Sequence, residues 1–215
     1  MPISTDIKGS KVFVTGADGF IGSHLVERLV NLGASVRGLC YYNSLGTIGN
    51  LVDLAPETLA SVDLVFGDIR DRSLLSAQMD GFDYIFHLAS LISIPHSYVA
   101  AQSYVDTNIC GLLNILEVLK SRSFTRFVNT STSEVYGTAI TRPIDETHPL
   151  QGQSPYSASK IAADHFVEAF HRSFEMPLVS LRPFNTFGPR QSVRAIIPTI
   201  ITQLINPNQK KPKTW

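Results

Sequence analysis

The sequence predicts an α/β fold in which a doubly wound parallel sheet carries helices on both faces. Short apolar segments that read as strands alternate with longer helical segments, and no repeat or low-complexity linker interrupts them. The apolar segments are continuous, which is typical of strands buried on both faces. The first of them leads directly into a glycine-rich turn and an amphipathic helix. In folds of this class, ligands bind at the C-terminal ends of the strands.

The N-terminal strand is predicted over residues 11–14, and glycines follow at positions 16, 19 and 22. Gly16 would make the tight turn, Gly19 would let the backbone approach a pyrophosphate, and Gly22 would let the next helix pack closely. Placed between a strand and a helix, this run predicts a Rossmann-like dinucleotide site. The apolar face of the helix is expected to comprise Ile21, Leu25 and Leu29, and Gly33 is expected to end it.

The remaining elements follow the same alternation. Further strands are predicted over residues 35–39, 64–66, 84–88, 127–129 and 178–181, with helices around residues 71–79, 98–121 and 156–175. The last two helices contain more apolar positions than one sheet face should need, among them Leu112, Leu113, Ile115, Leu116, Val118 and Leu119.

Composition excludes several classes of protein. The 215 residues are 44% hydrophobic, and 18 basic residues balance 18 acidic ones, so no nucleic-acid partner is expected. Cys40 and Cys110 are too few and too isolated for a disulfide framework, and the histidines show no metal-ligand spacing, so no metal is expected. Neither a signal peptide nor a membrane-spanning run is found, which predicts a cytoplasmic protein with no membrane partner.

Tyr156 and Lys160 are four residues apart in a predicted helix, so both side chains project from one face. A phenol has a pKa of about 10, and its use as a base near neutrality requires a lower value. The ammonium group of Lys160, next to a cationic nicotinamide, would supply that stabilisation. The pair alone is a weak pattern, because an ordinary amphipathic helix start contains it too.

Together with this pair, several motifs resemble the extended short-chain dehydrogenase/reductase family of nucleotide-sugar epimerases, dehydratases and decarboxylases. The chain looks most similar to sugar-nucleotide 4,6-dehydratases, including those of the legionaminate type. The matching segments are Gly16-Ala17-Asp18-Gly19-Phe20-Ile21-Gly22, Gly67-Asp68-Ile69, His87-Leu88-Ala89-Ser90, Asn108, Ser131-Thr132-Ser133-Glu134-Val135-Tyr136-Gly137, Arg182-Pro183-Phe184-Asn185 and Gly188-Pro189-Arg190.

The resemblance implies a cofactor site for NAD. By position, the pyrophosphate would be held by Gly16, Gly19, Phe20, Ile21 and Gly22, the adenine by Asp68 and Ile69, and the ribose side by Ala89 and Ser90, with Asn108 in the following helix also assigned to the site. Tyr156 and Lys160 would hold the nicotinamide ribose. One departure concerns the second strand, which ends in Cys40-Tyr41-Tyr42 where NAD-preferring members usually have an acidic residue. NAD is the expected cofactor, although the sequence alone leaves NADP open.

The resemblance also implies a reaction. Tyr156, with Thr132, would take the proton from the sugar C4 hydroxyl, and Glu134 would remove the C5 proton before water leaves from C6. Better-known dehydratases have an acid where this chain has Ser133, so water or Glu134 would have to deliver that proton. A uronate decarboxylase and a 4-epimerase therefore stay open as alternatives. Asn185 and, less strongly, Arg190 are expected to bind the sugar diphosphate.

The expected organisation is a cofactor domain over residues 1–190 and the start of a truncated substrate lobe over residues 191–215. Because family members usually continue into a lobe that closes over the substrate, a non-catalytic cofactor-binding fragment is a further possibility. The two long helices are expected, by resemblance, to pair with their copies in a homodimer. The nucleotide base and the sugar are not predicted.

Overall fold

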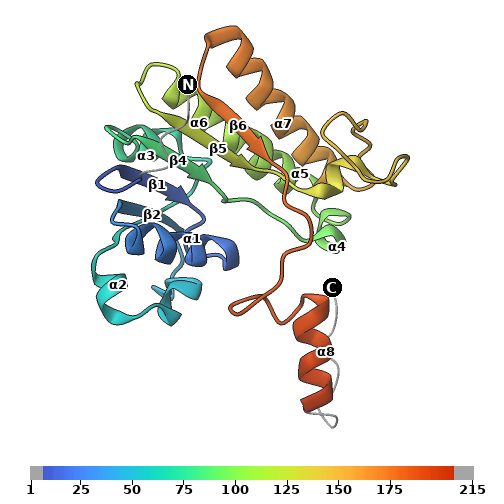
Figure 1. Cartoon of the computed structure of the whole chain (residues 1–215), viewed down its shortest axis with the longest axis horizontal. Coiled ribbons are helices and arrows are strands. Elements are labelled where there is room, and N and C mark those ends of the chain that lie inside the picture. The colour runs from blue at the N-terminus through green and yellow to red at the C-terminus, as the bar shows by residue number, and fades with distance from the viewer. Residues whose placement is uncertain (1–6, 206–215) are drawn as a thin grey trace.

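The computed structural model describes residues 7–205, which fold around one six-stranded sheet (Figure 1). Its strands are β1 (Lys11–Thr15), β2 (Ser35–Tyr41), β3 (Asp63–Gly67), β4 (Tyr84–His87), β5 (Arg126–Thr130) and β6 (Leu178–Leu181). All neighbouring strands are parallel, in the order β3-β2-β1-β4-β5-β6. The direction of winding reverses between β1 and β4, which confirms the predicted doubly wound sheet and creates a crevice at that point.

The connections between the strands are mostly helical. The longer helices are α1 (Phe20–Asn31), α3 (Arg72–Gln78), α6 (Gly111–Leu119), α7 (Pro155–Phe174) and α8 (Ile196–Ile205), and the shorter ones are α2 (Pro56–Ala60), α4 (Ile94–Ser97), α5 (Ala101–Tyr104), η1 (Gly49–Asp53) and η3 (Ser133–Tyr136). Between α5 and α6 lies η2 (Val105–Cys110), one stretch of π-helix. The three elements form one continuous helix over residues 101–119, so the single helix predicted here is found with a distorted middle.

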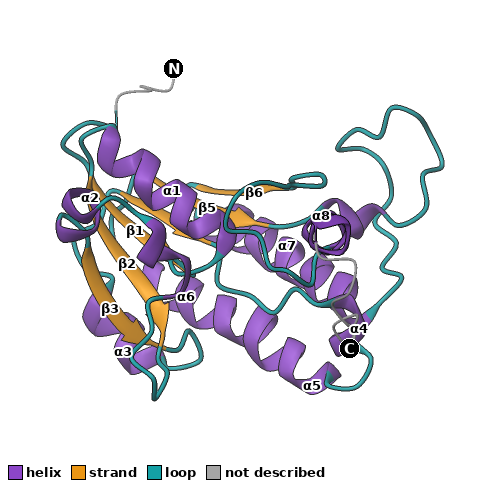
Figure 2. Cartoon of the chain, turned by 90° about the horizontal axis from the view of Figure 1, so that it is seen from below, coloured by secondary structure: helices purple, strands orange, loops and turns teal. Residues whose placement is uncertain are grey.

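Side chains of β1 show how the sheet separates two layers of core. Phe13 points into a cluster with residues of α3, α6 and α7, whereas Val12 and Val14 point into a cluster with residues of α1 and η1. Successive residues of a strand face opposite sides of the sheet, and all three side chains are fully buried because helices cover both faces. Figure 2 shows these helices around the sheet. The continuous apolar strands are thus explained by burial on both faces.

The buried face of α1 differs from the predicted one. Its buried residues are Gly22, Ser23, Val26 and Leu29, whereas Leu25 is partly buried and Ile21 is exposed. The helix is rotated because Gly22 must lie against the turn at Gly16, where an added Cβ would come within 2.0 Å of the Gly16 carbonyl oxygen. As predicted, the helix ends before Gly33, which has a positive φ of 81°.

The many apolar residues of α6 lie in the core of the chain. Five of the six positions, Leu112, Ile115, Leu116, Val118 and Leu119, are buried in the core, and Leu113 packs partly against it. These residues are therefore part of the core and offer no surface to a second copy.

The last described helix, α8, has no buried residue. Figure 1 shows it beyond an extended segment, away from the sheet. Its exposed apolar side chains include Ile196, Ile200, Ile201 and Leu204. Within residues 7–205, no helix is both long enough and apolar enough to cross a membrane.

Candidate active site

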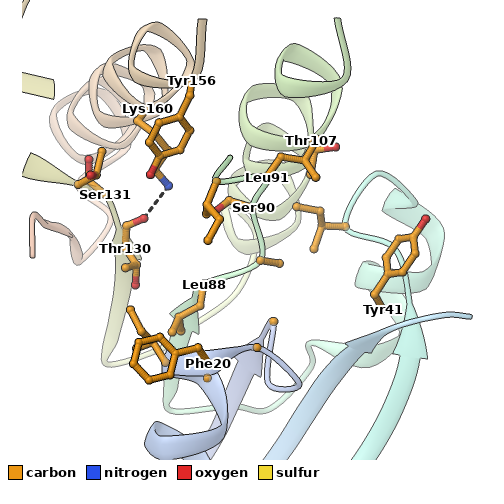
Figure 3. Close-up of a pocket in the computed structure, with 18 of the residues that line it drawn as sticks. Phe20, Tyr41, Leu88, Ser90, Leu91, Thr107, Thr130, Ser131, Tyr156 and Lys160 are labelled. Carbon is orange, nitrogen blue, oxygen red and sulfur yellow. Dashed lines mark hydrogen bonds between the residues drawn. The ribbon is translucent and has the colours of Figure 1, made fainter. Parts of the chain in front are cut away.

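A cavity of about 840 Å³ opens at the C-terminal ends of the strands, over the switch point between β1 and β4 (Figure 3). Most of the residues that the sequence predicts for the site line this cavity: Gly16, Gly19, Phe20, Ile21, Gly22, Asp68, Ile69, Ala89, Ser90, Thr132, Ser133, Glu134, Tyr156, Lys160 and Asn185. Segments that are far apart in the sequence thus meet in one place. Asn108 and Arg190 do not line it.

The glycine turn after β1 provides a cradle beside the first turn of α1. Gly16 has a positive φ of 67°, and a Cβ there would come within 2.8 Å of the Ala89 backbone nitrogen. A Cβ on Gly19 would meet only the Gly16 oxygen, at 3.2 Å, among the described atoms, so its outer side is open to the cavity. The first N–H groups of a helix have no partner within the helix and carry a partial positive charge. The cradle therefore fits a pyrophosphate.

Tyr156 is placed by the start of α7. Ser154 caps the helix: its hydroxyl accepts a hydrogen bond from the Ser157 backbone nitrogen at 3.1 Å, and the Ser157 hydroxyl accepts one from the Ser154 nitrogen at 2.9 Å. Pro155 occupies the first turn, where its missing N–H costs nothing. Because both hydrogen bonds fix the first turn, the ring of Tyr156 is held against the cavity.

Lys160 lies one turn further along α7, and its ammonium group donates a hydrogen bond to the Thr130 carbonyl oxygen at 2.7 Å (Figure 3). Burial lowers the pKa of Lys160 to about 8, while the negative charge of Asp164 acts in the opposite direction. His87, also buried, has its pKa lowered to about 3 by burial and by the charge of Lys160. His87 is therefore neutral and contacts the Thr15 hydroxyl through Nδ1 at 2.8 Å.

The pKa of Tyr156 was expected to be lowered by Lys160 together with a cationic nicotinamide, and in the chain by itself it is raised. Burial raises this pKa above the ordinary value, and the negative charge of Glu134 adds to the increase, whereas a hydrogen bond with the Thr132 side chain acts against it. Burial outweighs the stabilisation expected from Lys160 because a phenolate loses its hydration in the pocket. Without further positive charge, Tyr156 is a neutral phenol. Glu134 lines the same cavity as Tyr156.

A buried polar cluster joins α7, η3, β5 and the segment after β6. Asp164, on α7 and 3% exposed, accepts a hydrogen bond from the Arg182 Nε atom at 2.8 Å. Arg182 also donates to the Tyr136 hydroxyl at 3.1 Å, and its guanidinium lies over the Tyr136 ring. The other Asp164 oxygen accepts from the Asn129 side chain at 3.3 Å. The cluster thus ties α7 to η3, which carries Glu134, and to the segment after β6.

Asn108, in the π-helix, lies beside the cavity and not in its lining. Its side-chain oxygen accepts a hydrogen bond from the Leu91 nitrogen at 2.8 Å, and its nitrogen donates to the Leu91 carbonyl at 2.9 Å and to the Ser159 hydroxyl at 3.0 Å. Asn108 therefore holds the loop after β4, with Ala89 and Ser90, against α7. These contacts suit a residue that positions the loop, whereas the sequence predicted direct contact of Asn108 with the cofactor.

Arg190 differs from its expected position as well. Its Nη2 atom is 2.8 Å from Glu27 on α1, and its side chain is 11% exposed. The ion pair keeps the guanidinium at the surface of α1 and away from the described cavity, so the geometry does not place Arg190 against a sugar diphosphate. The sequence motifs do not predict this contact, because Glu27 lies 163 residues earlier in the chain.

Several cavity residues were not predicted from the sequence. They include Asp18 in the glycine turn, Thr130 at the end of β5, Ser131 directly after it, and Thr107 in η2. The Thr130 contribution is a backbone carbonyl, which no sequence motif could indicate. Asp18 could have been predicted from the sequence, since it is the one charged residue in a run of small and apolar ones. Among residues 7–205, no group of histidine, cysteine and acidic residues could hold a metal ion.

Comparison with known proteins shows the same arrangement elsewhere. Residues 13–214 match the family described as GDP-mannose 4,6 dehydratase. A dTDP-glucose 4,6-dehydratase of Actinoplanes is 36% identical over 204 residues, which cover 91% of this chain and 63% of that protein. One of Sinorhizobium fredii, described as probable, is 34% identical over 94% of this chain and 60% of its own length. The chain therefore spans about 60% of the length of these relatives.

Solved structures agree with this likeness. The dTDP-glucose 4,6-dehydratase of Streptomyces venezuelae, determined with NAD bound, superimposes with a TM-score of 0.83 at 33% identity, covering 92% of this chain and 62% of that one. A UDP-N-acetylglucosamine 4-epimerase of Methanobrevibacter ruminantium superimposes with a TM-score of 0.85 at 32% identity, covering 93% and 64%. Both dehydratases and epimerases are thus similar to this chain.

Proposed function

Because the chain belongs to the GDP-mannose 4,6-dehydratase family of NAD-dependent sugar-nucleotide enzymes, we propose that it supplies the cofactor and catalytic half of a sugar-nucleotide 4,6-dehydratase. The observation that carries the proposal is the meeting of Glu134 and Tyr156 in the cavity that holds the glycine cradle. An epimerase needs the tyrosine and has no obligatory use for a carboxylate beside it. We further propose the legionaminate type as the nearest subgroup, on the motifs alone.

The cradle and the adjoining strand ends fit NAD. Gly16, Gly19 and the first turn of α1 would hold the pyrophosphate, and Tyr156 with Lys160 would hold the nicotinamide ribose. When bound, NAD accepts a hydride from C4 of the sugar and returns it later. A cationic nicotinamide next to Tyr156 would also lower the phenol pKa, in the direction opposite to the effect of burial.

The side chains perform the proton transfers. Tyr156 takes the proton of the C4 hydroxyl as the C4–H bond breaks, and Thr132 hydrogen-bonds the same oxygen. The new ketone makes the C5 hydrogen acidic, and Glu134 takes that proton while the C6–O bond breaks. The departing hydroxyl leaves as water after it receives a proton, for which Ser133 is a poor donor, so Glu134 or water delivers it. Asn185 would bind the diphosphate.

A 4-epimerase is the second candidate, because Ser133 replaces an acid and a 4-epimerase superimposes closely. The two reactions, and a uronate decarboxylase, share the oxidation at C4. They differ in what happens at C5, where the dehydratase removes a proton and loses water and the decarboxylase loses carbon dioxide. The epimerase only needs the keto sugar to turn before hydride returns.

For the whole protein, we propose that residues 1–190 form the cofactor domain and that residues 191–215 begin a substrate lobe. The exposed apolar residues of α8 support this division, because a further part of the protein would cover them. We also propose a homodimer through the segments at residues 98–121 and 156–175. Its contacts would have to use exposed residues such as Val99 and Val105, since the α6 leucines lie inside the chain.

Mass spectrometry of products tests the function. This chain, and a version extended to the length of its relatives, would be incubated with NAD and with dTDP-glucose, GDP-mannose, UDP-N-acetylglucosamine or UDP-glucuronate. Loss of one water supports the dehydratase, loss of carbon dioxide identifies the decarboxylase, and a stereochemical change at constant mass identifies the epimerase. If both versions bind NADH and no sugar nucleotide is converted, the chain is a cofactor-binding module and the enzymatic proposal fails.

A further inference from the structure

The end of β2 raises the question of what recognises the adenosine ribose. In dinucleotide-binding sheets, an acid after the second strand accepts hydrogen bonds from the 2′-hydroxyl of NAD, and an arginine nearby accommodates the 2′-phosphate of NADP. Here β2 ends in Cys40 and Tyr41, with Tyr42 next. Neither type of residue stands at the expected position in the sequence.

Arg37, on β2, and Arg70, shortly after β3, both pair with carboxylates. Arg37 donates to Asp63 at 2.6 Å and does not line the cavity. Arg70 lines the cavity, but its guanidinium forms a forked contact with both Asp68 oxygens at distances of 2.6 and 3.0 Å. This pairing raises the pKa of Arg70 and lowers that of Asp68. Both arginines are thus already paired with a carboxylate, which makes each a weaker partner for a 2′-phosphate.

Asp18 brings a carboxylate to the end of β2 from a different strand. It lies between Gly16 and Gly19 in the glycine turn and lines the cavity. Its Oδ2 atom accepts a hydrogen bond from the Tyr41 backbone nitrogen at 3.3 Å, and its carbonyl oxygen accepts one from Asn50 at 2.9 Å. The backbone of Asp18 is thus held by Asn50 and its carboxylate by Tyr41, beside the end of β2.

We propose that Asp18 replaces the missing acid of β2: it binds the hydroxyls of the adenosine ribose and excludes NADP. The inference rests on NAD binding and is independent of the sugar-nucleotide reaction. A carboxylate offers about four lone-pair sites. The N–H groups of Tyr41 and of Asp18 itself use two of them, which leaves acceptors for ribose hydroxyls. A 2′-phosphate would bring a second negative charge against the same half-buried carboxylate, an unfavourable contact that confers specificity.

The position of Asp18 in the turn strengthens the assignment. The ribose adjoins the pyrophosphate in the cofactor, and Asp18 adjoins Gly19, which faces the space for the pyrophosphate. Burial raises the pKa of Asp18, and the Tyr41 N–H acts in the opposite direction. Burial raises the pKa of the neighbouring Cys40 thiol, and the charge of Asp18 adds to the increase. The hydrogen bond from the Tyr41 nitrogen places the carboxylate beside the end of β2.

Fluorescence titration with NADH and with NADPH tests the proposal in the absence of any sugar nucleotide. The unaltered chain should bind NADH at least tenfold more tightly than NADPH. Asp18→Asn keeps the shape of the side chain and removes its charge, so the preference should fall by about tenfold or more, through weaker NADH binding and tighter NADPH binding. Asp53→Asn, at an exposed acid of η1 outside the cavity lining, changes the net charge equally and should leave the preference unchanged.

Equal affinity of the unaltered chain for the two cofactors would overturn the inference. So would an Asp18→Asn variant whose two affinities fall together with their ratio preserved, because that outcome indicates a structural role for Asp18 in the turn. If Asp18→Asn does not fold, Asp18→Ser gives the same comparison with a smaller side chain. Absence of binding to either cofactor would instead refute the cofactor site and with it the proposed function.

Discussion

The buried ion pair between Asp164 and Arg182 gives a prediction whose size follows from its surroundings. Asp164→Asn keeps the shape of the side chain but removes its charge, which leaves the Arg182 guanidinium without a counter-ion inside the protein. Removal of one partner of a buried pair costs about 3–5 kcal/mol. Since the Arg182 side chain is 21% exposed and water can solvate part of its charge, we expect a loss near the lower limit, about 3 kcal/mol.

Urea denaturation followed by circular dichroism measures this loss as a change in the free energy of unfolding. Glu168→Gln is the matched control, because Glu168 lies four residues further along the same helix and pairs with Arg172 at the surface. An exposed pair of this kind contributes about 0.5 kcal/mol or less. The double variant Asp164→Leu with Arg182→Met should recover most of the loss, because no unpaired charge remains.

The same substitution should affect the neighbouring Lys160. The negative charge of Asp164 raises the pKa of Lys160, so its removal should lower that pKa further below about 8. Any pH profile of hydride transfer controlled by Lys160 would then shift to lower pH. An Asp164→Asn variant with the stability of the Glu168→Gln control and an unshifted profile would refute the reasoning, since the pair would then be solvated like a surface one.

Three further results are expected. Gly19→Val should fold, because the φ of Gly19 is −77°, yet it should weaken NADH binding in a fluorescence titration; unchanged affinity would exclude the cradle as the cofactor site. Tyr156→Phe should abolish hydride transfer. Glu134→Gln should still oxidise C4 and accumulate NADH, while product formation falls about a hundred- to ten-thousandfold. Normal turnover of Glu134→Gln would favour the epimerase. Between pH of about 8 and 10.5, Lys160 holds a proton in the unfolded chain and has released it in the folded chain. The free energy of unfolding of the parent, relative to that of Lys160→Met, should therefore rise with pH over this range. A decrease in that difference would contradict the prediction.

Local patterns in the sequence were sufficient for the framework. The strands, the glycine turn and the start of α7 depend on neighbours within a few residues, so the buried side chains of β1 and the position of Tyr156 could be predicted. The same holds for Gly33, whose positive φ ends α1. These elements together placed most of the candidate site.

Contacts between distant segments were not accessible in this way. Glu27 diverts Arg190, and Leu91 engages Asn108, through pairings that no motif records. The rotation of α1 that exposes Ile21 depends on how closely Gly22 approaches Gly16. The direction of the Tyr156 pKa shift in the chain without cofactor could not be predicted for a similar reason: the sequence shows the charge of Lys160 but not the extent of burial, which raises this pKa.

The π-helical segment between α5 and α6 has a consequence for insertions and deletions. A π turn is equivalent to one residue inserted into an α-helix, and one residue corresponds to about 100° of rotation. The apolar face of α6 and the inward position of Asn108 are therefore in phase only because of this extra residue. Deletion of a single residue between Val105 and Thr107 would convert the segment to regular α-helix. The apolar face of α6 and the side chain of Asn108 could then no longer both point toward the sheet. Conservative substitutions throughout η2 would be tolerated far better than that loss, so length, more than residue identity, is the property that this part of the helix must preserve.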